Sequence, residues 1–202
     1  MLTAGMALIA ALALQTAGQP VETAECRIIA DGIIPGRMHI PTRLRVDCAR
    51  DATDADRLQA AASAVIARVP LDLPRSASPV IVPSARFERA ANGNWQPAPG
   101  QRVFQVFPPL PRRMAERGYT DYACRYAVWP DAAGRPGDVE IECGLPRRAR
   151  HVAVREVREA VATVRFLPVE DAYCFERVLH VTPEGTTETN PEDRLLCPPG
   201  SP

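Results

Sequence analysis

Two segments of this chain follow the same pattern, and a pair of cysteines bounds each of them. Cys26 opens the first segment and Cys48 closes it, while Cys124 opens the second and Cys143 closes it. Each reads as Cys-Arg, an apolar strand, a turn rich in glycine and proline, an alternating strand and a final cysteine. This order predicts two β-hairpins, and it favours an internal duplication over a chance similarity between two α+β segments.

An amphipathic helix is expected after the first hairpin, at about Asp54–Val69. Thr53 or Asp54 is suited to cap its first N–H groups, and Pro70 ends it because proline lacks the N–H that a helix needs. Its apolar stripe consists of Leu58, Ala61, Ala62, Val65 and Val69.

A second helix is expected at Ala149–Phe166, with Pro168 as its stop. Valines recur three or four residues apart along it, which is the spacing of one buried helix face. Arg158 lies away from that stripe, so we expect it to be exposed. The stripe consists of Val154, Val157, Val161 and Val164.

The second half also contains three expected strands, at Tyr122–Trp129, Asp138–Cys143 and Phe175–Val181. Both halves reach the tripeptide Phe-Glu-Arg after the helix, at Phe87 and at Phe175, which supports the duplication. We therefore predict an α+β fold of two tandem strand-strand-helix-strand modules. Each module is a small antiparallel sheet with a helix on one face.

The chain divides into four expected parts: a signal peptide at 1–18, a degenerate module at 19–100, a second module at 101–182 and a polar tail at 183–202. The apolar run at the N-terminus is too short to span a membrane, which takes roughly 20 residues, but it suits a secretory signal. Ala90–Gln101 contains the tight-turn dipeptide Asn-Gly and is expected to connect the modules.

The six cysteines are even in number and stand behind a secretion signal, which indicates disulfides in a periplasmic or secreted protein. Cys26–Cys48 and Cys124–Cys143 are predicted because each pair closes one hairpin at equivalent repeat positions. Cys174–Cys197 follows by elimination. No cysteine or histidine spacing typical of a zinc site occurs, so we expect no metal and no cofactor.

The remaining composition argues against several function classes. The formal net charge is zero, and no strong attraction to nucleic acid or anionic membrane is expected. His39, His151 and His180 stand in no hydrolase signature, and Glu140 and Glu142 are expected to contact solvent on an exposed strand face. We expect a protein that is not an enzyme. Trp95 and Trp129 are expected to pack in the core or in turns.

The second half resembles the C-terminal domain of the TonB family. The resemblance rests on a Pro-x-x-Pro-like entry at Pro108 and Pro111, an arginine-rich turn at Arg112–Gly118, and an Asp-x-x-Gly turn at Asp131–Gly134. A helix and the exit Phe166-Leu167-Pro168 complete it, and the first half looks like a degenerate repeat. The chain departs from the energy-transducing members because it has neither a spanning helix nor a long proline-rich spacer.

The resemblance implies that the last strand binds an extended protein segment in the periplasm or outer membrane by strand addition. Carried onto this chain, the partner-binding residues are Phe175, Glu176, Arg177, Val178, Leu179, His180 and Val181. Phe175, Leu179 and Val181 share the face expected to meet the helix. The function expected is thus a periplasmic binding module, linked to outer-membrane transport. The alternatives are a disulfide-stapled secreted enzyme or inhibitor, and a purely structural domain whose edges pair with each other.

Overall fold

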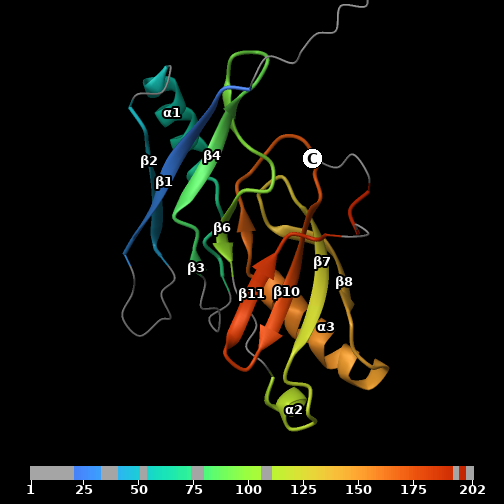
Figure 1. Cartoon of the computed structure of the whole chain (residues 1–202). Coiled ribbons are helices and arrows are strands. Elements are labelled where there is room, and N and C mark those ends of the chain that lie inside the picture. The colour runs from blue at the N-terminus through green and yellow to red at the C-terminus, as the bar shows by residue number, and fades with distance from the viewer. Residues whose placement is uncertain are drawn as a thin grey trace, which may run out of the picture.

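A computed structural model describes residues 21–32, 41–50, 54–73, 80–105, 111–192 and 196–198. The expected signal peptide lies outside these residues, as do Thr53, His39 and Pro108. The described part contains two four-stranded sheets and one three-stranded sheet, all antiparallel. One helix lies beside each four-stranded sheet (Figure 1), so the α+β fold class is confirmed.

The first half forms the sheet with strand order β2-β1-β4-β5. Its helix α1 packs on one face of this sheet through apolar side chains such as Leu58 and Val65, which meet Ile28, Leu44 and Phe87 in one core. The elements are β1 (Thr23–Asp31), β2 (Arg43–Cys48), α1 (Ala55–Ile66), β3 (Val80–Ile81), β4 (Ser84–Arg89) and β5 (Trp95–Pro97).

The second half forms the sheet with order β11-β10-β7-β8. Val157 and Val161 of its helix α3 are buried against Phe175, Leu179 and Val181 of β10, so the expected apolar faces of both elements are confirmed. The elements are α2 (Arg112–Ala115), β7 (Tyr122–Pro130), β8 (Pro136–Cys143), α3 (Arg147–Val161), β9 (Arg165–Phe166), β10 (Phe175–Thr182) and β11 (Gly185–Thr189).

The two four-stranded sheets have the same topology. Reading β2-β1-β4-β5 beside β8-β7-β10-β11 pairs every strand of one half with a strand of the other. The duplication therefore extends to a fourth strand, which the sequence analysis did not include in either module. In the first half this strand, β5, lies within Ala90–Gln101, which was expected to be only a connection.

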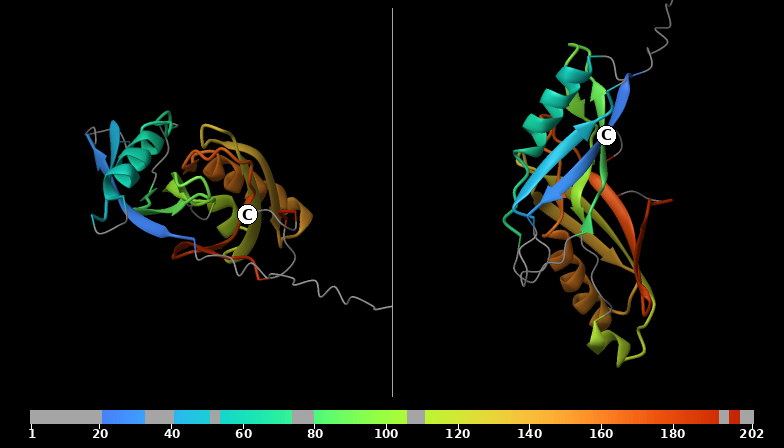
Figure 2. Two further views of the ribbon diagram at one scale, coloured as in Figure 1. Left: turned by 90° about the horizontal axis from the view of Figure 1, so that it is seen from above. Right: turned by 90° about the vertical axis from the view of Figure 1, so that its left-hand side faces the viewer.

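A small third sheet joins the halves. Its central strand β6 (Arg102–Gln105) pairs with β3 from the first half and with β9 from the second. Figure 2 shows the two larger sheets on either side of this link. Leu167, which directly follows β9, is buried in the core of the first half. The halves consequently share both backbone pairing and apolar contacts.

Both helices are shorter than expected. α1 ends at Ile66, and α3 ends at Val161 rather than at Phe166, because the chain then turns into β9. Val164 is buried beyond the helix end. The capping prediction for Asp54 is wrong: its backbone is left-handed, with φ of 57°, and its carboxylate makes no cap hydrogen bond. That carboxylate instead accepts a 2.7 Å hydrogen bond from Arg89.

The shared Phe-Glu-Arg tripeptide is not a structural equivalence. Phe175 lies opposite Val128, four residues after Cys124. Phe87 lies opposite Ala24, two residues before Cys26. The tripeptides therefore occupy different registers relative to the matching cysteines, and the common topology, rather than this sequence match, carries the duplication.

The expected turn at Asp131–Gly134 is confirmed. The Asp131 carboxylate accepts hydrogen bonds from the backbone N–H groups of Ala133 and Arg135, at 2.9 and 2.8 Å. Gly134 has φ of 80°, and a Cβ atom there would lie 2.2 Å from the Phe166 carbonyl oxygen. Only glycine fits this turn, because β9 passes directly beside it.

Candidate functional site

The three predicted disulfides are all present. Cys26–Cys48 and Cys124–Cys143 cross their hairpins with Cα–Cα distances of 4.0 and 4.1 Å. Cys174–Cys197 ties the tail to the start of β10. Disulfides persist in oxidising compartments, so the protein belongs to one.

The prediction that Phe175–Val181 is an open edge is wrong. This segment lies in β10, which pairs with β7 on one side and with β11 on the other. Gly185–Thr189 of the polar tail return as β11 and take the edge. Within the segment Phe175–Val181, Val178 lies opposite Thr189 of β11.

The tail also covers the outer face of β10. The Glu176 carboxylate is buried and accepts hydrogen bonds from the backbone N–H groups of Leu196 and Cys197, at 2.9 to 3.0 Å. Leu196 and the Cys174–Cys197 bridge pack against Ala127 and Trp129. A partner segment consequently has no access to this strand from its edge.

A buried polar cluster lies at the junction of β6 with the second sheet. Glu188 accepts from the Tyr126 hydroxyl at 2.5 Å and forms a 2.5 Å ion pair with Arg102. The guanidinium groups of Arg102 and Arg177 lie 4.8 and 4.4 Å from the ring centroid of Phe175. Burial raises the pKa of Tyr126, and the Glu188 charge raises it further. These contacts fasten β6 to β11 and are a structural link rather than a site.

Among the described residues, β2 ends the first sheet on the side opposite β5, and the hollows described below run beside it. Its Cys48 stands opposite Cys26 at a Cα–Cα distance of 4.0 Å. That close approach is typical of a non-hydrogen-bonded pair, which lies at about 4.5 Å rather than about 5.5 Å. The N–H and C=O of Cys48 therefore point away from β1, and so do those of Val46 and Leu44, because the direction alternates along a strand.

Gln59 of α1 caps part of this edge. Its side-chain oxygen accepts from the Cys48 N–H at 3.0 Å, and its side-chain nitrogen donates to the Val46 carbonyl at 2.9 Å. The same nitrogen also lies 3.1 Å from the Ser63 hydroxyl. These bonds confirm that the backbone groups of Val46 and Cys48 face outward. They leave the Leu44 N–H, the Leu44 C=O, the Val46 N–H and the Cys48 C=O as outward groups to which Gln59 does not bond.

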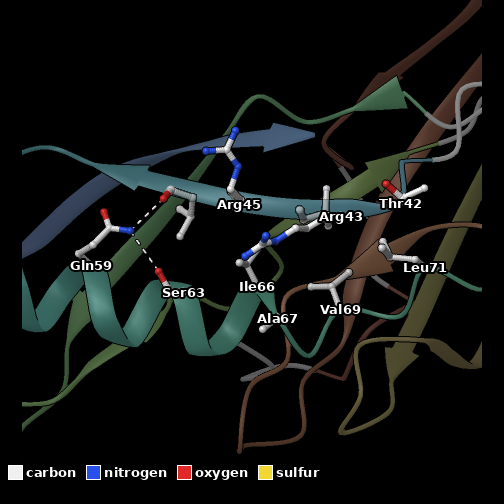
Figure 3. Close-up of a pocket in the computed structure, with 11 residues that line it drawn as sticks. Thr42, Arg43, Arg45, Gln59, Ser63, Ile66, Ala67, Val69 and Leu71 are labelled. Atoms are coloured by element: carbon white, nitrogen blue, oxygen red, sulfur yellow. Dashed lines mark hydrogen bonds between the residues drawn. The ribbon is translucent and has the colours of Figure 1, made fainter. Parts of the chain in front are cut away.

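A groove of about 540 Å³ runs between β2 and α1 beside these groups (Figure 3). Its β2 wall carries Arg43 and Arg45, and its α1 wall carries polar side chains at one end and apolar ones at the other. Figure 3 shows Arg43 extending from β2 toward α1, whereas Arg45 points away from the helix. The lining residues are Thr42, Arg43, Leu44, Arg45, Val46, Gln59, Ser63, Ile66, Ala67, Val69 and Leu71.

A second hollow, of about 820 Å³, continues along the same seam toward the end of β2. Gln59 lines both hollows and thus separates them. The second hollow is lined mainly by charged side chains of both signs, including Asp47, Arg50, Asp54 and Arg57. Its mixed charges give it no clear preference for a ligand.

The other singled-out residues within the described ranges lie on three different elements. His151 is exposed on α3, and the His180 ring lies 3.1 Å from the Thr189 hydroxyl. Glu140 and Glu142 are exposed on β8, as expected. Within the described residues, no group of three or more His, Cys, Asp or Glu side chains is placed to hold a metal ion. The helices described there are all too short or too polar to cross a bilayer.

Comparison with known proteins adds no relative: no protein-family model, curated protein or solved structure matches this chain. The resemblance to the TonB family accordingly remains a prediction from the sequence.

Sequence reasoning missed the β2 edge, although one signal for it was present. A disulfide across a hairpin requires a close, non-hydrogen-bonded pair of residues. The predicted Cys26–Cys48 bridge therefore already implies that the backbone N–H and C=O groups of Cys48, Val46 and Leu44 point away from β1. The cap by Gln59 had no such signal, because it depends on how α1 lies beside the strand.

Proposed function

We propose that this protein binds an extended segment of a partner protein, which adds to β2 as a new strand of the first sheet. The observation that carries this proposal is the row of outward backbone groups at Leu44 and Val46, set beside a groove. Main-chain N–H and C=O groups on an exposed edge pair with an added strand, and neighbouring pockets receive its alternate side chains.

The position of α1 supports this mode of binding. The helix does not fill the space beside β2, since the groove between them has a volume of about 540 Å³. An added strand lies about 4.8 Å from its neighbour in a sheet, so it enters the mouth of this groove. One face of the segment then meets Ile66, Val69 and Leu71, and the other faces solvent beside the arginines of β2.

The proposed function is the one that the TonB resemblance implies, but we assign the binding to a different strand. The resemblance implies binding by strand addition in the periplasm, with an outer-membrane transporter as the class of partner. The strand to which that role was assigned, β10, is enclosed by β7 and β11. We therefore place the binding edge on β2, in the half of the chain that looked degenerate.

Nuclear magnetic resonance on the full, ¹⁵N-labelled chain tests the proposal. The probe is a capped six-residue peptide in which valine and glutamine alternate, chosen because it is extended and uncharged. We expect it to shift the amide signals of Leu44 and Val46 and to slow their hydrogen exchange. The amide of Leu179, on the enclosed strand β10, should not change.

A matched pair of variants locates the binding. Ser63→Trp places an indole in the groove and should abolish the shifts, whereas Ala64→Trp, one residue further along α1 on its exposed side, should leave them unchanged. Absence of any shift on β2 with this peptide, or equal effects of the two variants, would contradict the proposed function.

A further inference from the structure

We propose that the β2 groove selects an extended segment in which acidic and apolar residues alternate, and that Gln59 sets where the added strand ends. This inference rests on the proposed function and specifies the chemistry of the partner.

The preference for acidic residues comes from Arg43 and Arg45, whose Cα–Cβ bonds leave β2 on the face opposite to Leu44. The Arg43 side chain then extends across the strand edge toward α1 (Figure 3), whereas Arg45 points away from the helix. Arg45 is already neutralised, because the Asp31 carboxylate accepts from its Nε at 2.5 Å and from its Nη2 at 2.9 Å. Arg43 stands two residues away and forms no ion pair with any other residue of the described chain. Asp31 lies opposite Arg43 on β1, but both of its carboxylate oxygens are bonded by Arg45, so the two arginines share one negative charge and carry a net charge of +1. Residues directly opposite in an antiparallel pair share a face, so the partner residue opposite Arg43 meets this net positive charge.

The preference for apolar residues comes from the other face. The partner residue opposite Leu44 shares the face of that leucine, which is turned toward α1. It therefore lies over the apolar end of the groove, beside Ile66, Val69 and Leu71. Since successive side chains of a strand point to opposite faces, an acidic residue next to an apolar one satisfies both requirements.

Gln59 limits the length of the added strand. Its amide donates to the Val46 carbonyl and accepts from the Cys48 N–H, which takes two of the four bonds that an antiparallel partner backbone would make at these two residues. An added strand thus uses the Leu44 N–H, the Leu44 C=O and the Val46 N–H, and it stops where the glutamine side chain begins.

Three capped six-residue peptides test the charge preference by the same titration of the full chain. They share the frame Thr-X-Val-X-Val-Thr, and X is glutamate, glutamine or lysine. We expect affinity to fall in that order, by about two- to fivefold from glutamate to glutamine, the size of one cross-strand charge pair. Arg43→Gln should remove the difference between the glutamate and glutamine peptides. Arg148→Gln, an exposed arginine on α3, is the control with the same change in net charge and should preserve it.

The outcomes separate the two proposals. Equal affinity for all three peptides, with shifts still at Leu44 and Val46, would overturn the charge preference and leave strand addition standing. No shift on β2 with any peptide would overturn both. Concentration-dependent changes of these amides without peptide, together with a dimer in sedimentation, would mean that a second copy of the chain occupies the edge, which also contradicts the proposal.

The role of Gln59 has its own test. Gln59→Leu keeps the size of the side chain and removes the amide. An eight-residue peptide with one more Glu-Val unit should bind this variant several-fold more tightly than the six-residue peptide does, while the unmodified protein binds both alike. Gln59→Glu, which keeps the acceptor for Cys48 but loses the donor for Val46, should give an intermediate gain. No gain with either variant would overturn the limit set by Gln59.

Discussion

β2 and β10 are both strands of a four-stranded sheet with a helix on one face, but they differ in their neighbours. β10 pairs on both sides, whereas β2 pairs only with β1 among the described residues. The difference comes from the chain that follows β10, because Gly185–Thr189 turns back and pairs with it. Whether a strand forms an open edge therefore depends on which other segments pair with it, and not on its position at the end of a module.

The two strands that correspond in the duplication, β2 and β8, differ in a second way. Both end their sheets within the described residues and both lie beside a helix. Gln59 makes two hydrogen bonds to the edge of β2, whereas the Arg158 side chain of α3 donates one, at 3.4 Å, to the Val139 carbonyl of β8. The exposed acidic residues of β8, Asp138 among them, also give its outer face the opposite charge to Arg43. The corresponding edge strands of the two halves therefore differ in how their helix caps them and in their charge.

The largest expected effect concerns the core behind β10. Val157→Asp should lower the free energy of unfolding by about 3–5 kcal/mol, because an unpaired charge would be buried in α3. Arg158→Ala, on the exposed neighbour, should change it by less than about 0.5 kcal/mol. Urea unfolding followed by circular dichroism measures both. Equal midpoints would mean that α3 is not packed on the second sheet by this face.

A proline on β10 tests whether that strand is enclosed. The backbone N–H of Val178 faces β11. Val178→Pro should therefore lower the free energy of unfolding by about 2–4 kcal/mol, because one hydrogen bond is lost and its acceptor on β11 is left unpaired. Val178→Thr, which keeps the N–H, is the control and should cost less than about 1 kcal/mol. A proline variant as stable as the threonine variant would show that β11 does not pair there, and that β10 is the open edge after all.

The sequence was sufficient for those features that depend on local pattern. The cysteine pairs, the turn at Asp131–Gly134 and the buried stripe with Val157 and Val161 follow from spacing and from hairpin geometry. The strands β3 and β9 are each two residues long and exist only because they pair with β6. No local pattern marks such strands, because their stability comes entirely from segments distant in the chain.

The same reasoning explains why the sequence predicts the binding edge on β10 and not on β2. The strand β11 has the sequence Gly-Thr-Thr-Glu-Thr, with no apolar residue, so hydrophobic alternation could not reveal it. Its pairing is held by β10 and by the buried Glu188–Arg102 contact. The cap on β2 likewise depends on a single glutamine at the distance set by helix packing.

A smaller effect on peptide selection is expected from removing the carboxylate partner of Arg45 on β2. Asp31→Asn removes the carboxylate that holds Arg45, and the preference for the glutamate peptide over the glutamine peptide should rise by a further factor of about two to five. Asp138→Asn on β8, with the same change in net charge, should leave the preference unchanged. Titration of both variants measures this, and an identical ratio in the two would show that charge at β2 does not select the partner.

Hydrogen exchange in the free, full chain tests most directly that β2 is open and β10 is closed. On β2 we expect alternation, with fast exchange of the Leu44 and Val46 amides, which face away from β1, and slow exchange of Arg45, which faces it. On β10 the neighbours Val178 and Leu179 should both exchange slowly, since one faces β11 and the other β7. Uniform protection along β2, or alternation along β10, would contradict the account.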